Sequence, residues 1–290
     1  MDLETLIILA IKLSIILTVF GFALHATPDH ALYLFRHPVE LFKSIMSMNV
    51  LMPLFTVYIA EAFSLHPAVR IALLTLAVSP VPPFLPKKEL KAGAHAAYAI
   101  GLLTAAALFS IILVPLTVEL FGKAFGRDVH IAPGTVAKIV FISVILPVTV
   151  GIAIRYFMPG LAERLAKPIS TGAAILLIVS VIPILFKAWP SIVSLVGNGT
   201  ILAILAFLLI GVITGHLLGG PDADDRTVLA LSTASRHPGV AMAVATANFP
   251  EQKLVLAAVL LYFLVNLVIT ALYLTWRRHH QPGFAGAIKT

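Results

Sequence analysis

The sequence predicts an all-α polytopic membrane protein with about nine transmembrane helices. Of its 290 residues, 60% are hydrophobic and only 11% are charged, whereas about a quarter of the residues are charged in a typical soluble domain. The mean hydropathy is +1.03. Long apolar runs recur along the chain, and about 20 mainly apolar residues are enough to span a bilayer. No stretch leaves room for a separate soluble domain, so residues 1–290 are predicted to form a single transmembrane domain.

The nine expected spans follow one another with short loops between them. They cover residues 5–25, 39–62, 67–86, 94–121, 134–156, 169–187, 199–219, 226–248 and 252–276. Asp2 and Glu4 precede the first run, where a cleavable signal would carry positive charge, so this run is predicted to remain as a helix. The connection "LHATPDH" is predicted to be a loop, and residues 277–290 are predicted to be a cytoplasmic tail.

Lysine and arginine predict the orientation in the membrane. An odd number of spans places the two termini on opposite sides, and the loops on the C-terminal side hold about twice as many lysines and arginines as the others. The positive-inside rule therefore predicts an N-terminus outside and a C-terminus in the cytoplasm, in the cell (inner) membrane. The same loops account for the formal charge of +7, so the bilayer is an expected partner and nucleic acid is not.

Residue types and motifs argue against an enzyme. The chain contains no cysteine, which excludes thiolate metal sites and cysteine nucleophiles. It also lacks an HExxH motif and a glycine-rich phosphate loop. We therefore expect no catalytic residues, no metal site and no cofactor.

Two expected spans are interrupted by proline. The stretches "AVSPVPPFLPKK" and "TASRHPGVA" hold Pro80, Pro82, Pro83, Pro86, Pro238 and Gly239. Proline removes a backbone donor and clashes with the preceding turn, so both helices should break there. One break falls in each half of the chain, about 1–125 and 130–276, and such matched breaks are typical of a transporter site between inverted repeats. The alternative is that proline only kinks two helices.

Polar side chains beside the breaks are the candidate substrate-binding residues. An arginine at membrane depth is costly, so Arg236 is expected to have a task. Together with the amides of a helix N-terminus it could hold a carboxylate or sulfate, or it could instead cap backbone carbonyls. The other candidates are His237, Ser235, Ser232, Lys87, Lys88 and Asn49. His237 could carry a proton, and the two lysines could simply follow the positive-inside rule.

Four stretches resemble the bile acid:sodium symporter family. They are "FRHPVELFKSIMSMNVLMPLFTVYIAEAF", "LHPAVRIALLTLAVSP", "KIVFISVILPVTVGIAIRYFMPGLAERLAKPIS" and "ALSTASRHPGVAMAVATANF". The resemblance runs over nearly the whole chain from about residue 30. It implies a core domain with two discontinuous, crossing helices and a panel domain that moves against it, in a member with nine spans. It also implies transport of bile acids or other organic anions, usually with sodium.

The chain departs from the family at the positions where the resemblance implies sodium ligands. Those positions, and one beside them, hold Met48, Leu85, Pro86, Ser232, Arg236 and His237. Sodium needs several oxygen ligands, which leucine, proline and methionine side chains lack. We therefore expect an organic anion or small carboxylate to be moved by alternating access without the family's sodium sites. The alternatives are a sodium symporter with relocated ligands, or a channel or membrane receptor on the same helices.

Overall fold

The computed structural model describes residues 3–86 and 95–280, and within them every regular element is helical. Among these described residues, seven helices are long and apolar enough to cross a membrane. They cover Thr5–Ala23, Pro38–Ala62, Ala96–Phe125, Pro133–Phe157, Pro159–Ser194, Thr200–Leu218 and Val255–His280. The predicted all-α polytopic membrane fold is therefore confirmed. The two remaining expected spans, 67–86 and 226–248, are interrupted helices.

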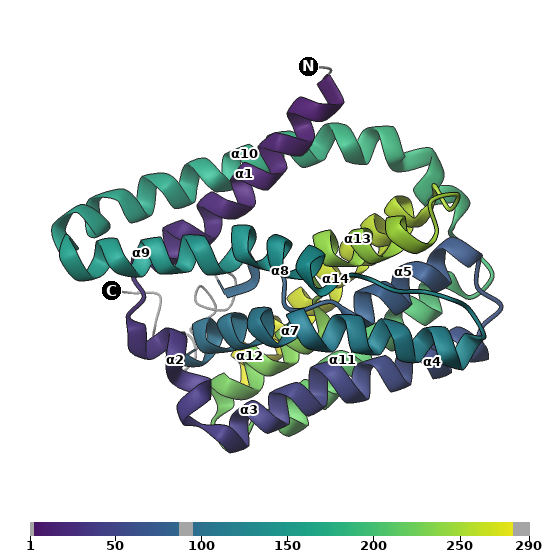
Figure 1. Ribbon diagram of the computed structural model, residues 1–290, viewed down its shortest axis with the longest axis horizontal. Coiled ribbons are helices and arrows are strands. Elements are labelled where there is room, and N and C mark those ends of the chain that lie inside the picture. Colours follow the sequence, from purple (N-terminus) through teal and green to yellow (C-terminus); the bar gives the residue numbers. More distant parts are fainter. Residues whose placement is uncertain (1–2, 87–94, 281–290) are drawn as a thin grey trace.

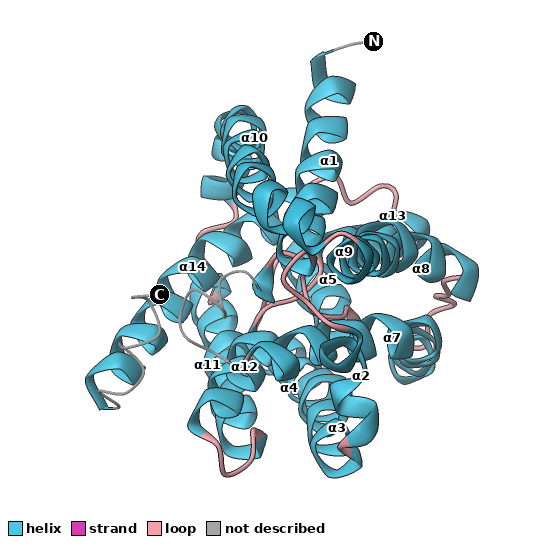
Figure 2. Cartoon of the chain, turned by 90° about the vertical axis from the view of Figure 1, so that its left-hand side faces the viewer, coloured by secondary structure: helices cyan, strands magenta, loops and turns pink. Residues whose placement is uncertain are grey.

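The helices form two layers, which Figures 1 and 2 show from two directions. The panel layer consists of α1 (Leu3–Ala23), α9 (Leu146–Phe157) and α10 (Pro159–Ser194), which pack against one another. The core layer contains α3 (Pro38–Ile45), α4 (Met52–Ala62), α5 (Pro67–Val78), α7 (Ala96–Phe125), α11 (Thr200–Leu218), α12 (Ala223–Ala234), α13 (Pro238–Asn248) and α14 (Val255–His280). The helix α8 (Pro133–Val140) leads into the panel and packs on α7 and α13.

Two of the long helices contain a π-helical stretch that ends two residues before a proline. Between α3 and α4 lies η1 (Met46–Leu51), and between α8 and α9 lies η2 (Phe141–Ile145). Proline lacks a backbone donor and disturbs the preceding turn. Here the N–H of the residue before Pro53 and of the residue before Pro147 donates to the carbonyl five residues back, one residue further than in an α-helix. Such bulges are frequent at functional sites.

The two predicted breaks are present. Helix α5 ends at Val78, directly before Ser79 and Pro80, and α13 begins at Pro238. Helix α12 ends at Ala234, so the second break covers residues 235–237 and Ser232 still lies in α12. The half-helices α5 and α12 have 12 residues each, which is about 18 Å or a little over half of a hydrocarbon core of about 30 Å. Both breaks therefore lie near mid-depth.

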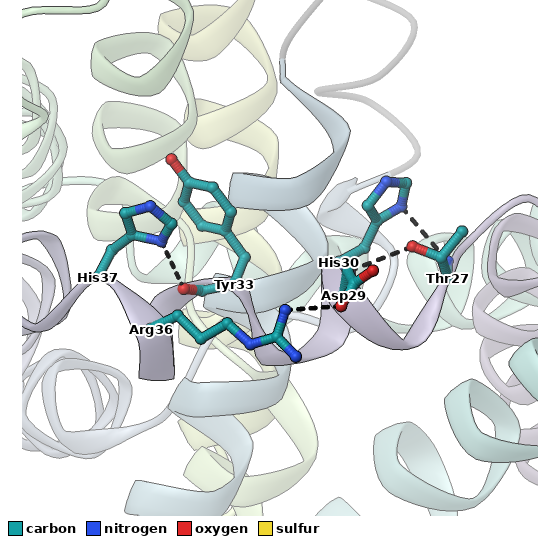
Figure 3. A network of polar contacts seen from close by, with 6 residues as sticks. All are labelled: Thr27, Asp29, His30, Tyr33, Arg36 and His37. Atoms are coloured by element: carbon teal, nitrogen blue, oxygen red, sulfur yellow. Dashed lines mark hydrogen bonds and ion pairs between the residues drawn. The ribbon is translucent and has the colours of Figure 1, made fainter.

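Several boundaries differ from the sequence prediction. The segment predicted as a loop at "LHATPDH" begins a short helix, α2 (Pro28–Arg36), whose first turn is capped by Thr27 and His30 (Figure 3). The helix α10 begins ten residues earlier than expected, at Pro159 instead of 169. Helix α14 continues to His280, so the predicted tail 277–290 starts as helix. Hydropathy marks only the apolar part of a helix, and these polar turns extend beyond it.

Candidate functional site

The two breaks and η1 meet at one place. The backbone N–H of His237 donates to the carbonyl of Pro80 at 2.8 Å, which joins the two extended segments. One turn away, the hydroxyls of Ser47 in η1 and Thr233 in α12 are 2.9 Å apart. We call the meeting point of η1 with residues 79–83 and 235–237 the crossing. Three irregular segments from distant parts of the chain thus satisfy one another's polar groups.

Arg236 is fully buried at the crossing, with 0% of its surface exposed. Its guanidinium donates to the carbonyl oxygens of Ser79 at 3.1 Å and Met48 at 3.0 Å. Ser79 caps the C-terminal end of α5, where carbonyls lack helical donors and a positive charge is favourable. Within the described residues no carboxylate forms an ion pair with Arg236, and its Nε has no partner. The crossing therefore carries one fixed positive charge held by backbone dipoles.

His237 caps α13 and also contacts the panel side. Its Nδ1 accepts hydrogen bonds from the backbone N–H groups of Gly239 at 3.1 Å and Val240 at 3.4 Å. The ring proton therefore lies on Nε2, which is 3.4 Å from the hydroxyl of Ser143 in η2. Two of the amides expected to bind an anion are thus occupied by His237 in this conformation.

Polar residues of α14, which the sequence analysis did not single out, complete the crossing. The Tyr262 hydroxyl donates to the carbonyl of Ala234, and the Asn266 amide donates to the Ser235 hydroxyl at 3.2 Å. The side-chain oxygen Oδ1 of Asn266 is buried and has no hydrogen-bond partner among the described residues. Tyr262, Asn266 and Thr270 recur every four residues on one face of an otherwise apolar helix. That polar stripe was the available sequence signal.

The structure brings most of the predicted site residues together. Ser235, Arg236 and His237 form the second break itself, and Ser232 is buried one turn earlier in α12. Asn49 is half-buried within η1. Lys87 and Lys88 lie outside the described residues. That these side chains bind substrate stays a prediction.

A cavity of about 440 Å³ runs from the start of α5 toward the crossing. Its size is within the range of small-molecule sites, about 300–1,000 Å³. It extends along α5 from Leu65 to Val78, the residue before Ser79, and is walled on the other sides by α7 and α13. The lining side chains are mostly apolar, with Arg70, Arg127 and Glu251 among the charged ones. The cavity therefore suits an apolar molecule with a charged group.

The cap on α13 gives a stability prediction. His237→Ala should lower the free energy of unfolding by about 1 kcal/mol, because the amides of Gly239 and Val240 lose their acceptor. His237→Asn should recover most of this loss, since asparagine is a favourable N-cap. Both are measurable by thermal unfolding in detergent, with Ser143→Ala as the control for the panel contact. Equal losses for His237→Ala and His237→Asn would contradict the capping role.

Comparison with protein families finds a match. The model of the sodium bile acid symporter family matches residues 12–194, which is more than half of the chain. The matched region runs from α1 to the end of α10 and includes η1, η2 and the first break. The second break, with Arg236, lies beyond it. The comparison with curated proteins gives no match.

Proposed function

Because the chain belongs to the sodium bile acid symporter family, we propose that it is a secondary transporter for an organic anion or small carboxylate that works without the family's sodium sites. The family is one of transporters with small-molecule substrates, and the apolar helices of this chain lie in a bilayer. The distribution of lysine and arginine among the loops supports an orientation with the N-terminus outside and the C-terminus in the cytoplasm.

The observation that carries the proposal is the place of the Arg236 guanidinium. It bonds to the carbonyls of Ser79 and Met48 and so bridges the first break and η1, as a bound cation would do with the same oxygens. A sodium ion beside it would be repelled strongly, because charges interact over several ångströms when water is excluded. Arg236 is therefore proposed to replace the ion permanently.

The cavity supports the proposed substrate class. Its apolar walls fit the body of an amphipathic organic acid, and its inner end, at Val78, adjoins the segment bonded by Arg236. The positive charge of Arg236 then attracts the acidic group, with Ser235 and His237 beside it. We propose Ser232, Asn49, Lys87 and Lys88 as further contacts, reached as the core and panel layers move during alternating access.

Uptake into proteoliposomes tests this function. A panel of organic acids should enter by saturable uptake that is the same with an inward gradient of sodium as with choline of equal ionic strength. Leu74→Trp should weaken uptake by filling the cavity. Leu116→Trp, a substitution on the exposed face of α7, should not.

Other outcomes would identify the alternatives. Uptake that rises steeply with the sodium gradient would indicate a symporter with relocated ligands. Flux that does not saturate would indicate a channel, and binding without flux would indicate a receptor.

A further inference from the structure

A second polar cluster lies at the end of α12 that is remote from the crossing. Asp225, in the first turn of α12 and just before the expected span 226–248, is only 6% exposed. Its Oδ1 is 3.5 Å from Nδ1 of His95, the N-cap residue of α7, and makes no hydrogen bond. A buried carboxylate oxygen therefore faces a titratable histidine.

The nearby arginines do not neutralise Asp225. Arg226 donates through Nε to the carbonyl of Gly220 at 2.7 Å. Arg277 donates through Nε to the Thr227 hydroxyl at 2.8 Å and also to the carbonyl of Ala223. Neither forms an ion pair with Asp225 within the described part of the chain. A purely structural role for Asp225 would be expected to use one of these permanent cations.

A second acid and a tyrosine approach the same place from other helices. Glu40 on α3 has a buried Oε2 that makes no hydrogen bond. Tyr33 on α2, seen beside His37 in Figure 3, has its ring 5.5 Å from that of His95. Burial, with added repulsion from Glu40 and Asp225, raises the pKa of Tyr33 to about 12. The tyrosine therefore stays neutral near neutral pH.

The surroundings favour a protonated Asp225. Burial raises the pKa of its carboxyl to about 6; His95 acts in the opposite direction, and the charges of Glu40 and of Asp222 at the start of α12 add to the rise. Asp224 also lies in this turn, with its own pKa raised by burial. A group of three side chains able to hold a metal ion does not occur within residues 3–86 and 95–280. The ligand that this chemistry accepts is a proton.

We propose that Asp225, with Glu40 and His95, forms a proton-binding site, and that its loading and unloading are coupled to transport of the anion. The site joins α3, α7 and α12, and α12 connects it directly to the break that carries Arg236. Loading one proton neutralises Asp225, which relieves its repulsion from Glu40 on α3 and changes its contact with His95 at the start of α7, so the packing of α12 differs between the two states. A proton that travels with a monovalent anion also leaves the transport cycle electrically neutral.

The proton site is tested without any substrate. A carboxyl with a raised pKa stabilises the fold while it is protonated, and this stability is lost as the pH rises through about 6. The melting temperature of the wild-type protein should therefore fall relative to that of Asp225→Asn as the pH rises from about 4 to about 6, and should stay below it at higher pH. Glu163→Gln, which removes an exposed acid paired with Arg155, should follow the wild-type profile. Parallel profiles for the wild type and Asp225→Asn would overturn the site.

Removal of the second acid tests its part in the site. Glu40→Gln should move the midpoint of the melting difference to lower pH, because a like charge is removed from beside Asp225. An unchanged midpoint would exclude Glu40 from the site.

The coupling rests on the proposed function and has its own test. In sodium-free proteoliposomes, an acidic exterior should accelerate uptake of the transported acid several-fold in the wild type. Asp225→Asn should keep exchange of the acid between the two sides but lose this acceleration. Uptake indifferent to the pH gradient would overturn the coupling and leave the transporter function intact. Absence of any uptake would refute the proposed function and the coupling, and the melting profiles would still decide whether the proton site exists.

Discussion

Arg236→Gln is expected to abolish uptake of the organic anion while the protein still folds. The substitution removes the fixed charge at the crossing and leaves the carbonyl of Ser79 or that of Met48 without a donor. An unsatisfied buried acceptor costs about 1–3 kcal/mol, so a lower melting temperature should accompany the loss of uptake. Ligand-induced thermal shift and uptake are measured on the same preparation.

The matched variant is Arg236→Lys, which retains the charge but lacks the two-pronged guanidinium. It should keep part of the uptake and lose stability, because one ammonium cannot bond both carbonyls as well. Full uptake by Arg236→Gln, with only lower yield, would show that Arg236 is structural.

Arg236→Gln also tests whether the guanidinium replaces an ion. With Arg236 removed, the oxygens of Ser79, Met48 and the introduced glutamine become available to a small cation. Sodium chloride should then raise the melting temperature of Arg236→Gln above the value in choline chloride, and should not do so in the wild type. An equal sodium effect in both proteins would contradict the replacement.

Substitutions in the contact between α11 and α12 are expected to have the second-largest effect on stability and uptake. A Cβ added at Gly211 would lie 2.7 Å from Cα of Ala234, and one at Gly215 would lie 2.5 Å from Cα of Ala230. Small residues let membrane helices approach closely, and overpacking such a contact costs about 1–3 kcal/mol. Gly211→Ala and Gly215→Ala should therefore lower the free energy of unfolding.

Gly211→Ala should also impair uptake, because Ala234 precedes the second break and its carbonyl accepts the Tyr262 hydroxyl. Gly172→Ala on α10 is the control, since a Cβ there meets nothing within 4 Å. Gly211→Ala as stable and active as Gly172→Ala would show that α11 and α12 tolerate separation.

Proline explains why the breaks could be predicted from the sequence. Pro80 and Pro238 lack a backbone donor, and α5 ends and α13 begins beside them, where the sequence indicates. Pro115 in α7 and Pro183 in α10, in contrast, stay inside continuous helices. Helix α2 and the first turns of α10 could not be predicted in this way, because hydropathy detects only the residues that favour the apolar core of the membrane. Helical turns outside that core, such as the turns of α10 that begin at Pro159, give no hydropathy signal.

Local composition and covalent geometry therefore determined the membrane setting, the helical class and the position of both breaks. The partners of Arg236 were decided only by the tertiary structure, because the acceptors at Ser79 and Met48 are backbone carbonyls that every residue type carries. The burial of Asp225 was also decided only by the tertiary structure. This residue belongs to the polar stretch "PDADD", whose composition suggests an exposed loop, yet its side chain is buried beside His95. Burial and partner choice depend on which distant segments pack together, and that is a property of the folded chain.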